Sequence, residues 1–392
     1  MSANATEVET LTRRLVSIPS YEDETAAGDA VEAWLREETD ARVTRDDHGN
    51  VIARRDVSVG TDRDDTAATG RGDGAASLAL VGHHDVVAPD GSQVADADGS
   101  RGDGSEATGT EYVVEKRDGR LYGRGTADMK GSLAAAMLAF RDADPAGELV
   151  FASFVGEEQG GVGARAAIDD GFAPDYAVVG EGSTNYAGDD QTDVAIAHRG
   201  RRGSTITARG TAAHASEPEA GENAVYRACD AVDVVRDLDA PEATVLGEEV
   251  RGSVVVTEIE GGSAWNVIPE RCTATVDERT VPGERAPLER VEEVDGVEWT
   301  VDQDLPPMAC REEGFADAVL AAADAAQSAT PEHVTKPHAT DAGWLSAAGT
   351  TCVVVGASEP GEAHTAHESV SIDVLERCRR IYQDVAERWP EE

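Results

Sequence analysis

Continuous hydrophobic runs recur along the chain, and each of them ends at a glycine. The four runs occupy residues 77–82, 149–156, 176–180 and 352–356. Such runs are typical of parallel strands that helices cover on both faces. Polar residues follow the glycines, among them His83, Glu157, Glu181 and His364. Because ligands gather at the carboxyl ends of parallel strands, we expect these side chains to converge in the folded chain.

Helical spacing accounts for much of the sequence between these strands. Val8, Leu11 and Leu15 recur at intervals of three and four residues, which predicts an amphipathic helix that ends at Pro19. Helices are also predicted over residues 27–34, 133–140, 315–327 and 373–389, and a pair of strands over residues 43–54. Strands that alternate with helices indicate an α/β fold, with a mixed, mostly parallel sheet and helices on both faces.

The pattern changes after Thr192. Strands are predicted over residues 194–209, 253–259, 272–279 and 297–301, and helices over residues 223–238 and 287–294. Four strands and two helices indicate a compact α+β domain of the ferredoxin-like type, inserted into the first domain. The α/β pattern resumes after two consecutive prolines. We therefore expect a discontinuous domain over residues 1–192 and 307–392, and an inserted domain over residues 193–306.

The chain carries a large excess of acidic residues. Its 34 basic and 77 acidic residues give a formal net charge of 34 − 77 = −43. This charge argues against nucleic acid or an anionic membrane surface as a partner. Only three of the basic residues are lysines, and an acidic composition dominated by arginine resembles that of proteins from extreme halophiles. Residues 58–75 and 88–110 are rich in Gly, Asp, Ser and Thr, so we expect exposed loops there.

The cysteine pattern and the first residues bear on the cellular compartment. The five cysteines are scattered and form no C-x-x-C pair, which favours a reducing compartment over a disulfide framework. The first ten residues lack the basic and apolar regions of a secretory leader, and no apolar run is long enough to cross a bilayer. We therefore expect a cytoplasmic protein that does not bind membranes.

Two histidines and several carboxylates follow the predicted strands, and this mixture of ligands suits zinc. A single tetrahedral site needs fewer ligands, so two metal ions that share one bridging carboxylate fit better. Two such ions can hold a hydroxide and polarise a carbonyl group, as the hydrolysis of an amide requires. Glu157 and Glu158 follow a strand, where successive side chains point in opposite directions. We expect one of them to bind metal and the other to transfer protons.

The motifs around these residues resemble those of the dinuclear zinc metallohydrolases that include acetylornithine deacetylase, succinyl-diaminopimelate desuccinylase, aminoacylase and glutamate carboxypeptidase. The similar motifs are Gly-His-His-Asp at residues 82–85, Gly-Arg-Gly-Thr-Ala-Asp-Met-Lys-Gly at residues 123–131, Gly-Glu-Glu at residues 156–158 and His-Thr-Ala-His-Glu at residues 364–368. The resemblance covers nearly the whole chain outside the two predicted loops. It implies two divalent metal ions, Zn²⁺ first of all, for which Co²⁺ can substitute.

The resemblance also implies a role for each of these residues and makes the discontinuous domain a metal-binding catalytic domain. The implied metal ligands are His83, Asp128, Glu158, Glu181 and His364. Asp128 is the implied bridge between the two ions. Glu157 is the implied general base, and Asp85 is implied to orient His83.

The inserted domain resembles the lid and dimerisation domain of the same family. His214, within residues 210–218, corresponds to a histidine that stabilises the oxyanion, commonly across a dimer interface. Asn266 and Arg279 lie in segments that resemble substrate-binding parts of the lid, and Arg279 is suited to a bidentate pair with a substrate carboxylate. A surface ion pair is the alternative role for Arg279. We therefore expect a homodimer that forms through the lid.

Three positions depart from the pattern of the family. His84 stands inside the His-x-Asp motif and competes with His83 as a ligand, although side-chain alternation points it away from the direction of His83. His367 stands where relatives more often carry Asn or Asp, so the choice of His364 rests on its spacing within the motif. Gly182 stands where the family frequently has proline. Residues 340–343 resemble another loop on the substrate side, to which we assign no role.

These observations favour a deacylase that removes the acyl group from an N-acyl amino acid through a hydroxide bound by two metal ions. A dipeptidase or carboxypeptidase with the same machinery is the close alternative, with a short peptide as substrate. A catalytically silent relative that binds metal or ligand is a third hypothesis. The presence of the base, the bridge and all the ligands argues against it.

Overall fold

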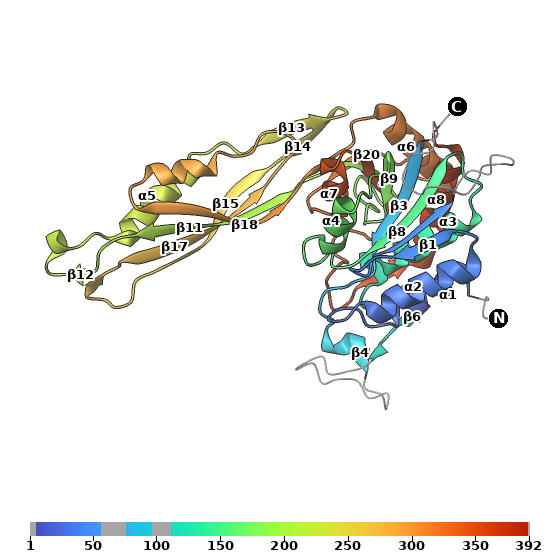
Figure 1. The fold of residues 1–392 in the computed structure, drawn as a ribbon, viewed down its shortest axis with the longest axis horizontal. Helices are drawn as coiled ribbons and strands as arrows, with labels where there is room; N and C mark the ends of the chain where they lie inside the picture. Colours follow the sequence, from blue (N-terminus) through green and yellow to red (C-terminus); the bar gives the residue numbers. More distant parts are fainter. Residues whose placement is uncertain (1–4, 56–75, 96–110, 391–392) are drawn as a thin grey trace. The chain divides into compact units, whose positions relative to one another are not determined.

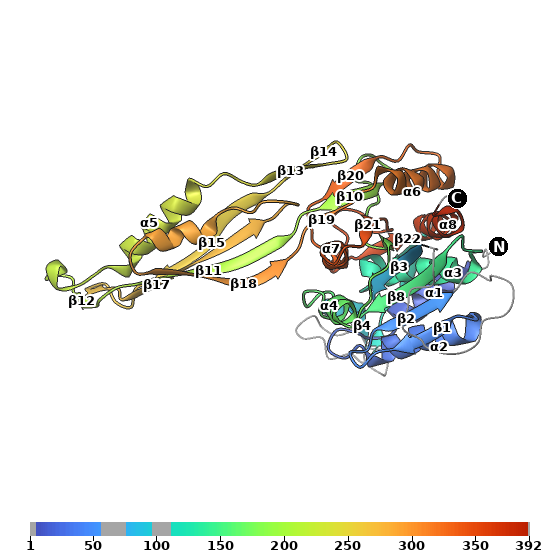
Figure 2. The same ribbon diagram turned by 45° about the horizontal axis from the view of Figure 1, so that its top comes forward.

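The structure is a computed structural model that describes residues 5–55, 76–95 and 111–390. The chain divides into two compact units (Figures 1 and 2). The first unit consists of Met1–Ile196, Ala309–Val334 and Thr340–Glu392, and the second of Ala197–Met308 and Thr335–Ala339. The loop predicted over residues 58–75, and most of that predicted over residues 88–110, lie outside the described residues.

A mixed sheet forms the centre of the first unit. In the described part of the chain its strand order is β1 (Arg42–Arg45), β2 (Val51–Arg55), β8 (Glu148–Phe154), β3 (Ser77–His83), β9 (Tyr176–Val179), β21 (Thr351–Val354), β10 (Val194–His198) and β19 (Met308–Ala309), and β20 (His333–Lys336) also pairs with β10. The central strands β8, β3, β9 and β21 are parallel, whereas β2 and β10 are antiparallel to their neighbours. The predicted α/β fold with a mixed, mostly parallel sheet is confirmed.

Helices cover both faces of this sheet. Figure 1 shows α3 (Gly131–Asp142) and α8 (Ile372–Arg388) on one side, and α4 (Val162–Asp169) and α7 (Asp341–Ala347) on the other. All seven residues of β3 are buried, as its continuous apolar run predicts. Helix α3 is buried around nearly its whole circumference because it packs against both β3 and α8.

Shorter elements complete the first unit. The helices are α1 (Glu7–Val16), α2 (Thr25–Glu38), α6 (Glu313–Ala326), η1 (Gly91–Gln93) and η2 (Thr126–Lys130), and the short strands are β4 (Val94–Ala95), β5 (Glu111–Tyr112), β6 (Glu115–Arg117), β7 (Arg120–Tyr122) and β22 (Ser369–Ser371). Val94 is buried against Val86 and Tyr112. The start of the segment predicted as a loop over residues 88–110 is therefore structured. The polar composition of the segment gave no sign that Val94 is buried.

An antiparallel sheet forms the second unit. Its strand order is β15 (Ser253–Gly261), β17 (Arg271–Arg279), β11 (Arg201–Arg209) and β18 (Val297–Leu305). Fully and partly buried residues alternate along β11 and β17, because one face of the sheet packs against α5 (Ala224–Arg236) and η4 (Leu288–Glu293). The chain order β11, α5, β15, β17, η4 and β18, with β18 beside β11, is that of a ferredoxin-like fold.

The strand predicted over residues 194–209 is in fact two strands, β10 and β11. Strand β10 belongs to the large mixed sheet and is buried throughout, whereas β11 alternates and belongs to the antiparallel sheet. They separate at Gly200, where a Cβ atom would lie 2.3 Å from the backbone oxygen of Leu305. The predicted helix over residues 287–294 is the short 3₁₀ helix η4. The change of period at Gly200 is the sequence signal that marks the boundary between the two strands.

A hairpin of the second unit was not expected from the sequence. It consists of β13 (Glu242–Val245) and β14 (Glu248–Arg251), joined by Leu246 and Gly247 with φ of 48° and 95°. Two positive φ values are typical of a type I′ turn, for which asparagine is usual at the first position. The other short elements are β12 (Ala213–His214), η3 (Pro218–Ala220) and β16 (Val267–Ile268). Within the described ranges, each helix is too short or too polar to cross a membrane.

We predict that His198, the last residue of β10, contributes to sensitivity to acid. Its side chain is fully buried, and burial lowers its pKa from 6.5 to about 3. Between these pH values the unfolded chain binds a proton that the folded chain excludes. The stability is therefore present above pH 6.5 and is lost as the pH falls toward 3, by about 1.4 kcal/mol per pH unit.

Urea unfolding of the wild type and His198→Gln across this pH range measures the effect. We expect the variant to lose less unfolding free energy on acidification. His48→Gln, at an exposed turn, is the control and should follow the wild type. Parallel pH profiles for the wild type and His198→Gln would contradict the prediction.

Candidate metal and catalytic site

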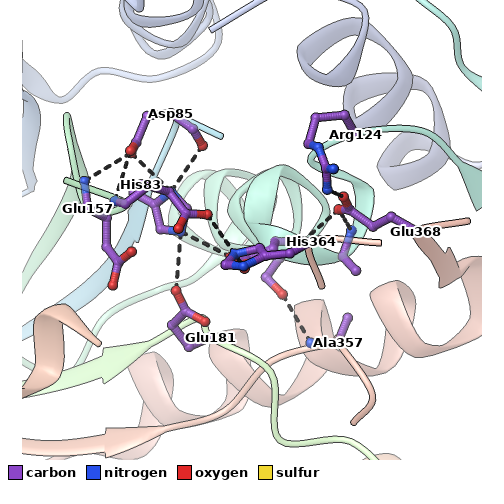
Figure 3. Close-up of polar contacts among 12 residues, drawn as sticks. His83, Asp85, Arg124, Glu157, Glu181, Ala357, His364 and Glu368 are labelled. Atoms are coloured by element: carbon purple, nitrogen blue, oxygen red, sulfur yellow. Dashed lines mark hydrogen bonds and ion pairs between the residues drawn. The ribbon is translucent and has the colours of Figure 1, made fainter. Parts of the chain in front are cut away.

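The carboxyl ends of the parallel strands deliver acidic and histidine side chains to one place. His83 is the last residue of β3, and Glu181 follows β9. Glu157 and Glu158 follow β8. His364 lies between β21 and β22, and its φ of 64° is in the left-handed region, which few residues other than glycine adopt. Figure 3 shows His83, Glu157, Glu181 and His364 converging.

Two groups of possible metal ligands share one carboxylate, that of Asp128. In the first group, Nε2 of His83 lies 3.2 Å from Oδ1 of Asp128 and 3.2 Å from Oε1 of Glu181. In the second group, Nε2 of His364 lies 3.0 Å from Oε1 of Glu158 and 3.1 Å from Oδ2 of Asp128. Each group has ligand atoms within 4.8 Å of one another. The two oxygens of Asp128 thus face different histidines.

The charges around the histidines favour bound cations. Burial disfavours a charge on His83, but Asp85 and the carboxylates of its group outweigh burial and raise its pKa well above 6.5. Asp128 and Glu158 raise the pKa of His364 to about 10. Imidazole nitrogen and carboxylate oxygen are the donors that zinc and similar divalent ions accept. The residues present therefore fit a pair of divalent ions.

Asp85 holds both His83 and the turn that follows β8. Its Oδ1 lies 3.1 Å from Nδ1 of His83, which leaves Nε2 facing the first group. The same carboxylate accepts hydrogen bonds from the backbone N–H groups of Glu157, at 3.2 Å, and Glu158, at 3.0 Å. A carboxylate behind a histidine ligand fixes the orientation of its ring. The buried Asp85 therefore couples the position of His83 to that of the two glutamates.

A buried ion pair between Arg124 and Glu368, to which the sequence analysis assigned no role, positions Asp128. Glu368 accepts hydrogen bonds through Oε1 from the backbone N–H groups of Ala127, at 2.9 Å, and Asp128, at 3.1 Å. Its Oε2 lies 2.6 Å from Nη1 of Arg124, and both side chains are buried. Figure 3 shows this pair beside His364. Both residues lie inside motifs that the sequence singled out, so their place in those motifs was the available signal.

The carboxylate of Glu157 belongs to neither group of ligands but lies beside them (Figure 3). Burial raises its pKa well above 4.5; His83 opposes this effect and Asp341 adds to it. Asp341 begins α7, and neither of its carboxyl oxygens has a hydrogen-bond partner within the described residues. Burial raises the pKa of Asp341 to about 8. Residues 340–343, which received no role from the sequence, therefore place a second buried acid close enough to act on Glu157.

The three positions that depart from the family pattern lie outside both groups. His84 is buried with Nδ1 2.8 Å from Oγ of Ser153, and burial lowers its pKa to about 3. His367 is exposed. At Gly182, a Cβ atom would lie 2.6 Å from Cβ of Ser358, so the glycine permits a close approach of two loops. In the described part of the chain, neither histidine joins a group of possible metal ligands.

The residues expected in the lid lie in the second unit. His214 is on β12, and its Nε2 lies 3.5 Å from Nδ2 of Asn266, so the fold brings these two side chains together. Arg279 is at the far end of β17, where its Nε donates a hydrogen bond of 2.8 Å to Oδ1 of Asp277. The structure therefore separates Arg279 from the other two residues and gives it an ion pair within its own strand.

The sequence that forms this site matches a known family. Residues 79–388 match the model of peptidase family M20/M25/M40. The chain belongs to this family. Membership confirms the resemblance to metallohydrolases that the sequence motifs indicated, and its named relatives are hydrolases of amide bonds.

Curated relatives are identical to the chain at about a third of the aligned residues. Succinyl-diaminopimelate desuccinylase from Rhodospirillum centenum is 31% identical over 358 residues, which cover 84% of this chain and 86% of the relative. Acetylornithine deacetylase from Myxococcus xanthus is 30% identical over 334 residues, 80% of each chain. A probable succinyl-diaminopimelate desuccinylase from Staphylococcus epidermidis is 33% identical over 242 residues, and this alignment spans 55% of that relative.

Solved structures share the fold across the whole chain. Aminopeptidase PepT from Bacillus cereus has a TM-score of 0.74 with 18% identity, and the match covers 97% of each chain. A dinuclear metal-binding peptidase of family M20 from Bacillus subtilis has a TM-score of 0.64 with 15% identity, and the match covers 97% of this chain and 96% of that one. At these identities the similarity shows the fold alone.

We predict that Glu368→Gln weakens the binding of both metal ions, because Asp128 is shared and loses its charged support. We expect affinity for Zn²⁺ to fall about 10- to 100-fold, as is usual when a partner behind a ligand is changed. Competition with a chromophoric chelator measures the affinity. Glu359→Gln is a matched control, because Glu359 pairs with Arg120 at 2.7 Å and not with Arg124. Equal affinities for wild type and Glu368→Gln would contradict the prediction.

Proposed function

We propose that the chain is a metal-dependent hydrolase that removes the acyl group from an N-acyl amino acid. The observation that carries this proposal is the sharing of Asp128 by two groups of possible ligands, with the partly buried carboxylate of Glu157 beside them. Two relatives aligned over at least 80% of this chain are named as a desuccinylase and a deacetylase of amino acids, which supports this class of substrate.

Two divalent ions are part of the proposal, with Zn²⁺ as the native metal and Co²⁺ as a substitute. His83, Asp128 and Glu181 would hold one ion, and Asp128, Glu158 and His364 the other. Bound there, the ions would lower the pKa of water and polarise the carbonyl group of the amide. The solved M20 peptidase from B. subtilis is described as binding two metals, which supports a dinuclear centre here.

Glu157 is the proposed general base. Its carboxylate belongs to neither group of ligands, so it can take a proton from the attacking water and deliver it to the leaving amine. Burial raises the pKa of Glu157, and a base works best when its pKa is near the working pH. Asp85 holds the backbone of Glu157 and the ring of His83 at the same time, which keeps the base and this ligand in register.

The second unit would complete the site as a lid. We propose that His214 stabilises the oxyanion and that Asn266, beside it, binds substrate. Arg279 would bind the substrate carboxylate in a bidentate pair, and this requires it to exchange its contact with Asp277.

A homodimer through the second unit belongs to the same proposal. Strand β15 is at the edge of its sheet and exposes Val255 and Ile259, and the side chains of Tyr226 and Trp265 are exposed as well. Trp265 is 97% exposed. A sheet edge with apolar side chains around it is suited to pairing with a second copy.

A dipeptidase or carboxypeptidase is the second candidate function. Solved structures with the same fold include an aminopeptidase and a peptidase of family M20, which supports this alternative. The hydrolytic machinery would be the same, and the group on the acyl side of the amide would differ. A silent relative that binds metal without turnover is the third candidate, and the position of Glu157 beside both ligand groups argues against it.

We predict that Glu157→Ala lowers kcat by about 10²- to 10⁴-fold while both metal ions stay bound, because the variant removes the proton carrier and no ligand. The zinc-loaded protein is assayed on N-acetyl and N-succinyl amino acids and on dipeptides, in molar salt that screens its charge of −43. Gln159→Ala, at an exposed position of the same turn, is the control. Turnover by Glu157→Ala at the wild-type rate would sink the mechanism. A wild type that hydrolyses only dipeptides would select the peptidase, and one inert on every substrate the silent relative.

We predict that mixing Glu157→Ala and His214→Ala protomers restores part of the activity that each lacks alone. In a hybrid dimer, one site would receive an intact base from one chain and an intact histidine from its partner. Subunit exchange is followed by mass spectrometry under native conditions, and activity is measured on the same samples. Exchange without recovery of activity would show that His214 acts within its own chain.

A further inference from the structure

Three consecutive backbone N–H groups in the turn after β8 are each held by a carboxylate. The N–H of Gly156 donates to Oε2 of Glu24 at 3.1 Å. Those of Glu157 and Glu158 donate to the two oxygens of Asp85, at 3.2 and 3.0 Å. Asp85 comes from the His-x-Asp motif, whereas Glu24 comes from a separate part of the chain and from no motif that the sequence singled out. Two acids from distant segments therefore fix the direction of the turn.

This turn depends on such contacts because its internal backbone hydrogen bonds are donated only by residues 159–162. The N–H of Gly160 donates to the backbone oxygen of Glu157 at 2.8 Å, and that of Gly161 to Gly156 at 3.1 Å. The first three N–H groups are left to outside acceptors. Gly156 has a φ of 59°, a left-handed conformation that glycine adopts easily and abandons easily. A loss of the acceptor at Gly156 would therefore free the residue that sets the direction of Glu157.

Glu24 is placed for this contact and not for the stability of its own helix. It occupies the N-cap position of α2, yet its side chain makes no capping hydrogen bond. Burial, followed by the negative charge of Asp85, raises its pKa to about 7. In the part of the chain that the structure describes, no salt bridge involves Glu24. A partly buried acid without an ion pair is costly, so a role outside α2 is needed to account for it.

We propose that Glu24 is a positioning residue that orients the general base Glu157 through the backbone of Gly156. The inference rests on the proposed function, in which Glu157 transfers the proton. The contact needs an acceptor oxygen and no charge, because a protonated carboxyl group still accepts through its carbonyl oxygen. An amide side chain of the same length therefore replaces Glu24, whereas a shorter side chain does not reach.

Steady-state kinetics of Glu24→Gln, Glu24→Asp and Glu24→Ala test the proposal in the zinc-loaded protein. We expect kcat to fall about 10- to 100-fold in the aspartate and alanine variants, as for a small misplacement of a catalytic group, with KM within about twofold of wild type. Glu24→Gln should keep kcat within about threefold. Asp23→Ala, which removes the neighbouring exposed acid, should behave as wild type. If the alanine variant fails to fold, the aspartate and glutamine variants carry the comparison.

A double variant separates positioning of the base from a general effect on structure. If Glu24 acts through Glu157, then adding Glu24→Ala to Glu157→Ala lowers kcat no further, because the group that Glu24 positions is already gone. A further loss of tenfold or more in the double variant would overturn the proposal. Unchanged zinc affinity in Glu24→Ala is also expected, since Asp85 still holds the backbone of Glu158.

The failure of this inference is distinguishable from the failure of the proposed function. Full activity in Glu157→Ala would show that Glu157 is not the general base, and it would overturn the proposed function. An inactive Glu157→Ala together with a wild-type kcat in Glu24→Ala would leave the function intact and overturn only the role of Glu24. A parallel fall of kcat and zinc affinity in Glu24→Ala would show that Glu24 supports the metal ligands. That result would also overturn its role toward the base.

Discussion

Mutual repulsion among carboxylates at one edge of the mixed sheet is the constraint on which the rest of the structure depends. Asp128, Glu158 and Glu181 meet beside two histidines, with Glu157 at their side. Negative charges gathered in a partly buried place destabilise a fold unless positive charge joins them. The parallel strands β8 and β9 bring Glu158 and Glu181 together because their carboxyl ends share one edge, and η2 adds Asp128. The fold therefore favours the binding of cations at this edge, whichever metal they are.

Three acids outside the two groups of possible ligands fix the positions of the segments that carry those groups. Asp85, Glu368 and Glu24 all accept hydrogen bonds from backbone N–H groups at or next to the proposed metal ligands or the proposed base. A side-chain oxygen that accepts from a backbone N–H group satisfies that donor and holds a loop that has no regular structure. The site is thus built in two layers, with the inner acids facing the metal sites and the outer acids fixing the segments that carry them.

The sequence predicted the inner layer and largely missed the outer one, for a physical reason. Strand ends and residue types are local features, so β3, β8 and β9 and the histidine and acidic residues after them followed from hydrophobic runs and short motifs. The contact of Glu24 with Gly156 joins residues 132 positions apart, and that of Glu368 with Ala127 joins residues 241 positions apart. Contacts at such separations leave no periodicity. The break between β10 and β11 was missed because the two strands follow one another with only Arg199 and Gly200 between them, and only the change from a continuous to an alternating pattern separates them.

The connection of the second unit to the mixed sheet has a consequence for how this architecture can vary. Strands β10 and β19 are neighbours in that sheet, and the polypeptide between them forms nearly all of the second unit. A segment whose two ends leave from adjacent strands can be lengthened, exchanged or shortened to a turn without rethreading the remaining sheet. The inserted segment can thus vary in length and sequence while the strands of the mixed sheet remain unaltered.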